Sequence, residues 1–95
     1  MESGIELIRK EREEQIEKHN RTVDLDIKIN DEYQLPFAAS VLSHPFLLKS
    51  EMISSIPKGW NLTIWTKMCS KTRKERYIIA GALIAAELDR LINQA

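Results

Sequence analysis

The stretch RYIIAGALIAAELDRL, Arg76–Leu91, decides the fold. It has no proline and is apolar on nearly every side, which is typical of a helix packed among several others. Thr72 and Glu75 precede it at the spacing of a capping box, in which each side chain satisfies the other's free backbone N–H group. The sequence therefore predicts a long central helix over residues 73–93.

One carboxylate, Glu87, interrupts this apolar helix. An unpaired ionised carboxylate in a protein core is costly, so Glu87 needs a partner, a proton or a place beside a cavity. Partners are available in residues 4–19, which open with the capping box Ser3–Glu6 and contain no helix breaker before Asn20. At 100° per residue the inward face of this first helix carries three polar side chains: Arg12, Gln15 and His19.

We therefore predict a buried polar contact between the two long helices, with Arg12 as the first choice of partner for Glu87 and His19 as the second. In the simplest interpretation this contact only fixes how the helices align. In the alternative, Glu87 lines a polar pocket for a ligand or metal together with Glu11 or Gln15.

The segment TVDLDIKIN at residues 22–30 alternates apolar and polar residues, a pattern typical of an extended segment with one buried face. No second alternating run exists to pair with it. The segment is therefore expected to cover the helices as an extended strand or, alternatively, to pair with its own copy in a dimer; we favour the cover.

The remaining sequence predicts short helices. One ends near Ser43, because His44 precedes a proline, and Pro57 and Gly59 separate two further helical pieces. The predicted fold is a single all-α domain over residues 1–95. It is a small helical bundle with two long helices (about 4–19 and 73–93), two or three short helices and an extended segment at 22–30.

Composition narrows the classes of partner. Fourteen basic and fourteen acidic residues give a formal net charge of zero, which argues against nucleic acid or an anionic membrane as partner. Cys69 is the only cysteine, so no disulfide forms within the chain, and residues 77–86 are an apolar run of half a membrane span. We expect a soluble cytoplasmic protein.

Two other regions are candidate sites. A basic cluster at the start of the last helix predicts an anion site, although a solvated charged turn is the alternative; it comprises Lys71, Thr72, Arg73, Lys74 and Arg76. Trp60 and Trp65 are expected to close one end of the core, with their indole N–H groups on polar neighbours. If they are exposed instead, together with Phe46, Leu47 and Leu48, they would mark a partner surface.

The segments IRKEREEQIEKHNRTVDLD near the start, KGWNLTIW, and ERYIIAGALIAAELDRL resemble a family of small phage and prophage proteins. Some members are grouped with all-α nucleotide pyrophosphohydrolases of the MazG type, so the resemblance implies a helical fold and, in those enzymes, carboxylates that hold Mg²⁺ against a nucleoside triphosphate. The implied metal ligands here are Glu11, Glu14, Asp24, Asp26 and Glu87.

This chain departs from the family pattern between its two ends. Leu25 and Ile29 stand where histidines are expected, and Gln34 replaces a glutamate. Apolar side chains cannot bind Mg²⁺, and a neutral amide is a weak ligand. Glu87 and Asp89 also lack the E-x-x-D spacing that would put both carboxylates on one helix face.

The leading functional hypothesis is a non-enzymatic interaction or oligomerisation module without a cofactor. Its partner would be an unknown protein or a second copy, bound through the extended segment or a face of small residues: Gly81, Ala82, Ala85 and Ala86. The alternative is a reduced MazG-like, Mg²⁺-dependent nucleotide pyrophosphohydrolase. A catalytic Ser/His/Asp arrangement, a glycine-rich phosphate loop and zinc-ligand spacing are all absent from the sequence.

Overall fold

The computed structural model describes residues 1–94, and all regular secondary structure in that range is helical. The elements are α1 (Gly4–His19), α2 (Val23–Ile29), α3 (Gln34–Ser43), α4 (Lys49–Ser54), α5 (Leu62–Cys69) and α6 (Arg73–Asn93). The all-α prediction is confirmed, and both long helices have the predicted bounds. The short helices are four, not two or three, because residues 23–29 are also helical.

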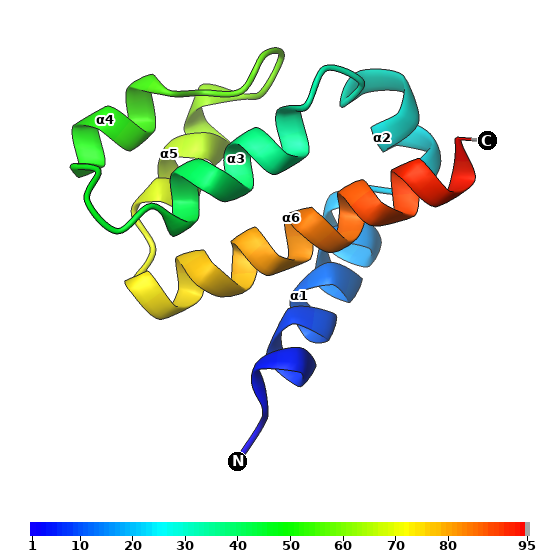
Figure 1. Cartoon of the computed structure of the whole chain (residues 1–95), viewed down its shortest axis with the longest axis horizontal. Helices are drawn as coiled ribbons and strands as arrows, with labels where there is room; N and C mark the ends of the chain where they lie inside the picture. The colour runs from blue at the N-terminus through cyan, green and yellow to red at the C-terminus, as the bar shows by residue number, and fades with distance from the viewer. Residues whose placement is uncertain (95) are drawn as a thin grey trace.

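Helix α6 crosses the whole molecule and contacts α1, α2, α3 and α5 (Figure 1). The apolar core lies between α6 and the group α3, α4 and α5, and Leu35, Leu42, Trp65 and Leu83 are its largest fully buried apolar side chains. Helix α1 packs against α6 from another side, and its buried residues, Arg12 and Gln15, are both polar. The fully buried side chains of the first helix are therefore polar, while its partly buried Ile8 packs on Gly81 of α6.

Local sequence signals set the helix ends. The Ser3 hydroxyl accepts a hydrogen bond from the Glu6 N–H at 3.2 Å, and Thr72 and Glu75 form the predicted capping box. Asn20 ends α1 in the left-handed conformation, with φ 52°. Gly59, with φ 82°, makes the turn that follows Pro57.

The prediction of an extended segment at residues 22–30 is wrong, since Val23–Ile29 form α2. A lone strand would leave its backbone groups unpaired, whereas a helix satisfies most of them internally. The Thr22 hydroxyl caps α2 by accepting from the Leu25 N–H at 3.3 Å, and the Asn30 N–H bonds to the Asp26 carbonyl at 2.9 Å. The pairing of this segment with a copy as a strand is excluded by the same observation.

Within residues 1–94, no helix combines the length and the apolar character that crossing a membrane requires.

Candidate functional site

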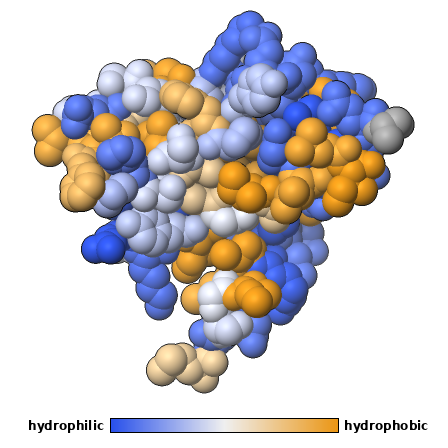
Figure 2. All heavy atoms as spheres, viewed as in Figure 1, coloured by the Kyte–Doolittle hydropathy of each residue, from blue (hydrophilic) through white to orange (hydrophobic). Residues whose placement is uncertain are grey.

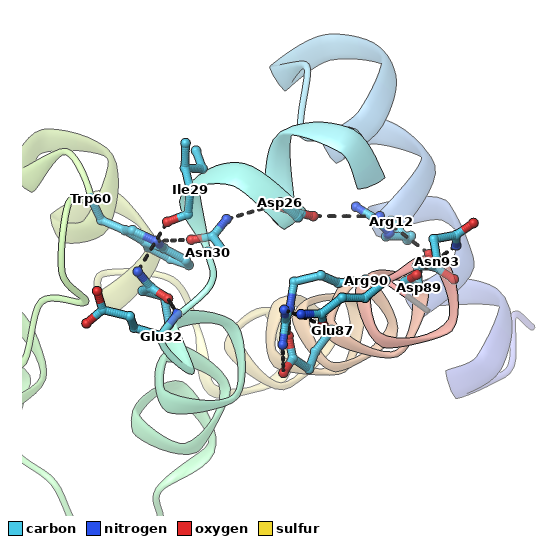
Figure 3. Close-up of polar contacts among 12 residues, drawn as sticks. Arg12, Asp26, Ile29, Asn30, Glu32, Trp60, Glu87, Asp89, Arg90 and Asn93 are labelled. Carbon is cyan, nitrogen blue, oxygen red and sulfur yellow. Dashed lines mark hydrogen bonds and ion pairs between the residues drawn. The ribbon is translucent and has the colours of Figure 1, made fainter.

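Six polar residues are buried where α1, α2 and α6 meet: Arg12, Gln15, Asp26, Asn30, Glu87 and Arg90 (Figure 3). Burying so many polar groups is costly unless their hydrogen bonds are made, so the contacts within this polar cluster determine what it can do.

Glu87 is buried as predicted, but its partner lies on its own helix. Arg90 Nε donates to Glu87 Oε1 at 2.7 Å and Arg90 Nη2 donates to Oε2 at 3.1 Å, a two-point ion pair within α6. The hydrogen bonds to Glu87 raise the pKa of the Arg90 guanidinium above its ordinary value. The predicted contacts of Glu87 with Arg12 and with His19 are wrong, and His19 is exposed at the end of α1.

Arg12 instead connects α1 to two other segments. Its Nη1 donates to the Arg21 carbonyl at 3.0 Å and its Nη2 donates to Asp89 Oδ2 at 3.4 Å. The same Nη2 is 4.0 Å from Asp26 Oδ2. The predicted link between the two long helices therefore exists, but it runs from Arg12 to Asp89 and not to Glu87.

A chain of hydrogen bonds continues from Asp26 through Asn30 to Trp60, which precedes α5 in the chain (Figure 3). Asn30 Nδ2 donates to Asp26 Oδ1 at 2.7 Å, and Trp60 Nε1 donates to Asn30 Oδ1 at 2.8 Å. This chain anchors α2, whose only buried helical residue is Asp26. The Asp26 carboxylate thus ties α2 to the rest of the polar cluster.

Three buried atoms of the polar cluster lack a hydrogen-bond partner within the described residues: Arg12 Nε, Gln15 Oε1 and Asp26 Oδ2. Gln15 uses its Nε2 to donate to Glu11 Oε2 at 3.3 Å. Glu11 and Gln15 line a pocket of about 280 Å³ with His19 and Arg21, but Glu87 does not reach it. The pocket at Glu11 and Gln15 is therefore lined without Glu87, which was predicted to share a pocket with one of them.

The five carboxylates named as possible Mg²⁺ ligands are not gathered. In the part of the chain that the structure describes, no three His, Cys, Asp or Glu side chains lie close enough to hold one ion. Asp24 is exposed, while Asp26 and Glu87 are engaged in the contacts described above. Glu11 is half-buried, and burial raises the pKa of its carboxyl.

The side chains of the basic cluster predicted as an anion site do not converge on one point. Arg76 turns inward, where its Nη1 donates to the Leu42 carbonyl at 3.2 Å. Arg73 lies over the Tyr77 ring, 5.5 Å from its centre, and Thr72 is occupied by the capping box. Lys71 and Lys74 remain exposed, so two of the five named side chains extend freely into solvent.

Trp60 and Trp65 close one end of the core as predicted. Their rings meet edge to face at 5.8 Å, and Trp65 Nε1 donates to the Met52 carbonyl at 2.9 Å. Phe46 and Leu48 are exposed and Leu47 is half-buried, but the tryptophans do not join them at the surface.

Sequence reasoning missed one apolar surface, the α6 outer face, defined here as Tyr77, Ile84, Leu88, Leu91 and Ile92. Leu88, Leu91 and Ile92 are 55%, 51% and 73% exposed, and Ile84 is 41% exposed. Figure 2 shows apolar atoms gathered over the part of α6 that faces the viewer. The sequence contains a signal for this face, because apolar residues recur every seven positions at Tyr77, Ile84 and Leu91. With Leu88 four residues after Ile84, this spacing is that of a coiled-coil seam.

The small-residue face predicted for dimerisation is used inside the chain. Ala82 and Ala86 are buried, and Gly81 lies under Ile8 of α1, where an added Cβ would be 2.5 Å from Ile8 Cδ1. The apolar residues of α6 that stay exposed are the large side chains of the α6 outer face.

Comparisons of this chain with models of known protein families, with curated proteins and with solved structures find no match.

Asp26 makes the polar cluster sensitive to pH. Burial raises the pKa of its carboxyl above the ordinary 3.8, and the negative charge of the nearby Glu87 raises it further. The hydrogen bond from Asn30 and the positive charges of Arg12 and Arg21 lower this pKa, but by less. A raised folded-state pKa gives stability that is complete below the unfolded-state pKa and is lost as pH rises through the folded-state value.

We therefore expect Asp26 to contribute a decrease in the free energy of unfolding as pH rises above about 3.8. Asp26→Asn should remove this contribution to the slope, which for one proton is at most ~1.4 kcal/mol per pH unit. Urea titrations at several pH values measure the slope. Asp24→Asn, on the exposed side of the same helix, is the matched control. An unchanged slope in Asp26→Asn would show that Asp26 does not titrate in this range.

Proposed function

We propose that this chain is a non-enzymatic interaction module that pairs with a second copy of itself through the α6 outer face. The observation that carries the proposal is the exposure of four large aliphatic side chains on one face of the central helix: Ile84, Leu88, Leu91 and Ile92. Contiguous apolar surface of this kind is uncommon on monomeric proteins unless it binds something.

The pattern of the face supports a helical partner. Tyr77, Ile84 and Leu91 recur every seven residues, and Leu88 lies four residues after Ile84. This is the spacing that keeps one side of a helix against another helix. From Tyr77 to Ile92 the face extends for about 22 Å at 1.5 Å per residue.

Charge supports a second copy as that partner. The formal net charge of zero means that two copies do not repel each other as a whole. The two ends of α6 also differ in charge. Arg73 and Lys74 are exposed at its start, whereas the acidic side chains near its end are already paired, Asp89 with Arg12 and Glu87 with Arg90. The free carbonyl groups of a helix C-terminus then give that end a partial negative charge.

Light scattering on a sizing column tests the proposal. We expect the wild-type mass to be twice the chain mass of 11.0 kDa, and Leu88→Glu to be monomeric, because two glutamates would be buried against apolar surface in the dimer. Leu88 is more than half exposed, so the fold should survive, as circular dichroism would show.

Phe46→Glu is the control variant, because Phe46 is 85% exposed but lies outside the α6 outer face. It should dimerise like the wild type. A monomeric wild type at concentrations of about 100 µM, which would mean a dissociation constant well above the micromolar range, would refute the proposal.

A further inference from the structure

An apolar crevice lies at the start of α6, at the end opposite to its most exposed aliphatic residues. It has a volume of about 630 Å³ and is lined by Gly4, Leu7, Ile8, Tyr77, Ile78 and the side chains of Arg73 and Lys74. We call it the N-terminal crevice. It exists because α1 and α6 meet at Ile8 and Gly81 and diverge from there, so the start of α1 projects away from the bundle (Figure 1).

The start of α6 is hollowed by the crevice, whereas its C-terminal end carries projecting apolar side chains. Leu91 and Ile92 are 51% and 73% exposed in its last turn, and they are nonpolar side chains of the size that a crevice of this volume accommodates. Tyr77 belongs both to the wall of the crevice and to the α6 outer face, so the hollow and the projecting ends are parts of one surface.

We infer that two copies pair with their α6 helices antiparallel, so that Leu91 and Ile92 of each copy enter the N-terminal crevice of the other. This inference rests on the proposed self-association and adds its geometry. Tyr77 and Leu91 each lie seven residues from Ile84. A two-fold axis beside Ile84 therefore brings Tyr77 of one copy opposite Leu91 of the other, and the interface is the same patch on both copies.

Antiparallel pairing also matches the charges. It brings the exposed Arg73 and Lys74 at the rim of one crevice beside the carbonyl groups at the C-terminal end of the other α6. In a parallel pair the two basic starts would lie together, and each crevice would face another crevice. The projecting residues would then have no hollow to fill.

Cysteine cross-linking tests the orientation. In a Cys69→Ala background, which removes the native thiol, Tyr77→Cys and Leu91→Cys are made as separate proteins with tags of different length. A disulfide needs Cβ atoms about 3.5–4.5 Å apart. In the antiparallel dimer, two copies of residue 77 lie about 21 Å apart along the helix, fourteen residues at 1.5 Å each.

We expect the Tyr77→Cys protein alone to remain uncross-linked and its mixture with the Leu91→Cys protein to give a disulfide-linked species of mixed mass as the main product under mild oxidation. Phe46→Cys, mixed with either protein, is the control for random collision. As a second measurement, Ile92→Glu should weaken dimerisation at least tenfold, because a residue buried in the crevice contributes more than ~1.4 kcal/mol.

The outcomes separate the two proposals. A dimer by light scattering in which Tyr77→Cys cross-links to itself would overturn the antiparallel geometry and leave self-association intact. A dimer that forms no mixed disulfide would overturn the pairing of residue 77 with residue 91. A monomeric wild type would remove both proposals together.

Discussion

Trp65→Ala is expected to lower the free energy of unfolding by about 3–5 kcal/mol, the range for removing a large aromatic side chain from a core. Trp65 is fully buried in the apolar core between α6 and the group α3, α4 and α5, with an exposure of 0%. The substitution leaves a cavity, removes the edge-to-face contact with Trp60 and leaves the Met52 carbonyl without its indole donor. A domain of this size has a total stability of roughly 5–14 kcal/mol, so the variant should lose a large part of it.

Urea unfolding followed by circular dichroism measures this loss, with Trp65→Phe as the conservative comparison. Phenylalanine keeps an aromatic ring in the core but cannot donate to the Met52 carbonyl, so its loss should be smaller, about 1–3 kcal/mol. Trp60→Phe, at the half-buried partner ring, is a further comparison; it keeps an aromatic ring but removes the hydrogen bond from the indole N–H to Asn30 Oδ1. A loss below about 1 kcal/mol for Trp65→Ala would contradict the position of the indole in the core, because cavity formation alone costs more.

The first and last helices could be predicted because the sequence signals that specify them are local. The capping boxes at Ser3 and Thr72 and the apolar pattern of residues 73–93 specify helices whatever surrounds them, and both helices have the predicted bounds. The break at His44–Pro45 is local in the same sense.

Segment 22–30 was predicted wrongly because its apolar pattern was given more weight than its ends. Alternation over seven residues also fits a short helix, which places Val23 with Ile27 and Leu25 with Ile29 at i, i+4. The cap residue Thr22 and the acidic residues of its first turn favoured a helix, and no other strand existed to satisfy an extended backbone.

The partners in the polar cluster were missed for a different reason. The predicted partners of Glu87 lie on another helix, whereas Arg90 follows it at i, i+3 on the same face of its own helix. With Glu87 already paired, Arg12 was free to bind Asp89 and the Arg21 carbonyl. Which of several polar groups pair depends on where the helices cross, and that crossing is set by Ile8 on Gly81, a contact that no local pattern indicates.

Arg90→Met should be the most damaging substitution in the polar cluster, with an expected loss of about 3–5 kcal/mol. It removes both donors from the Glu87 carboxylate, which has only 11% of its side chain exposed and lies near a second carboxylate, Asp26. The cost comes from the isolated charge more than from the lost attraction, because a buried ion pair contributes little net stability compared with apolar residues of similar size.

This explanation makes the double variant decisive. Glu87→Met combined with Arg90→Met removes the stranded charge and should recover most of the loss, so a double-mutant cycle from urea titrations should give a coupling of at least ~2 kcal/mol. The exposed pair Arg9–Glu13, at 2.8 Å, is the control, and Arg9→Met should cost under ~1 kcal/mol. If the double variant were as unstable as Arg90→Met alone, the pair would be needed for its own attraction, and the placement of Glu87 in the apolar helix would have to be explained by function instead of by pairing.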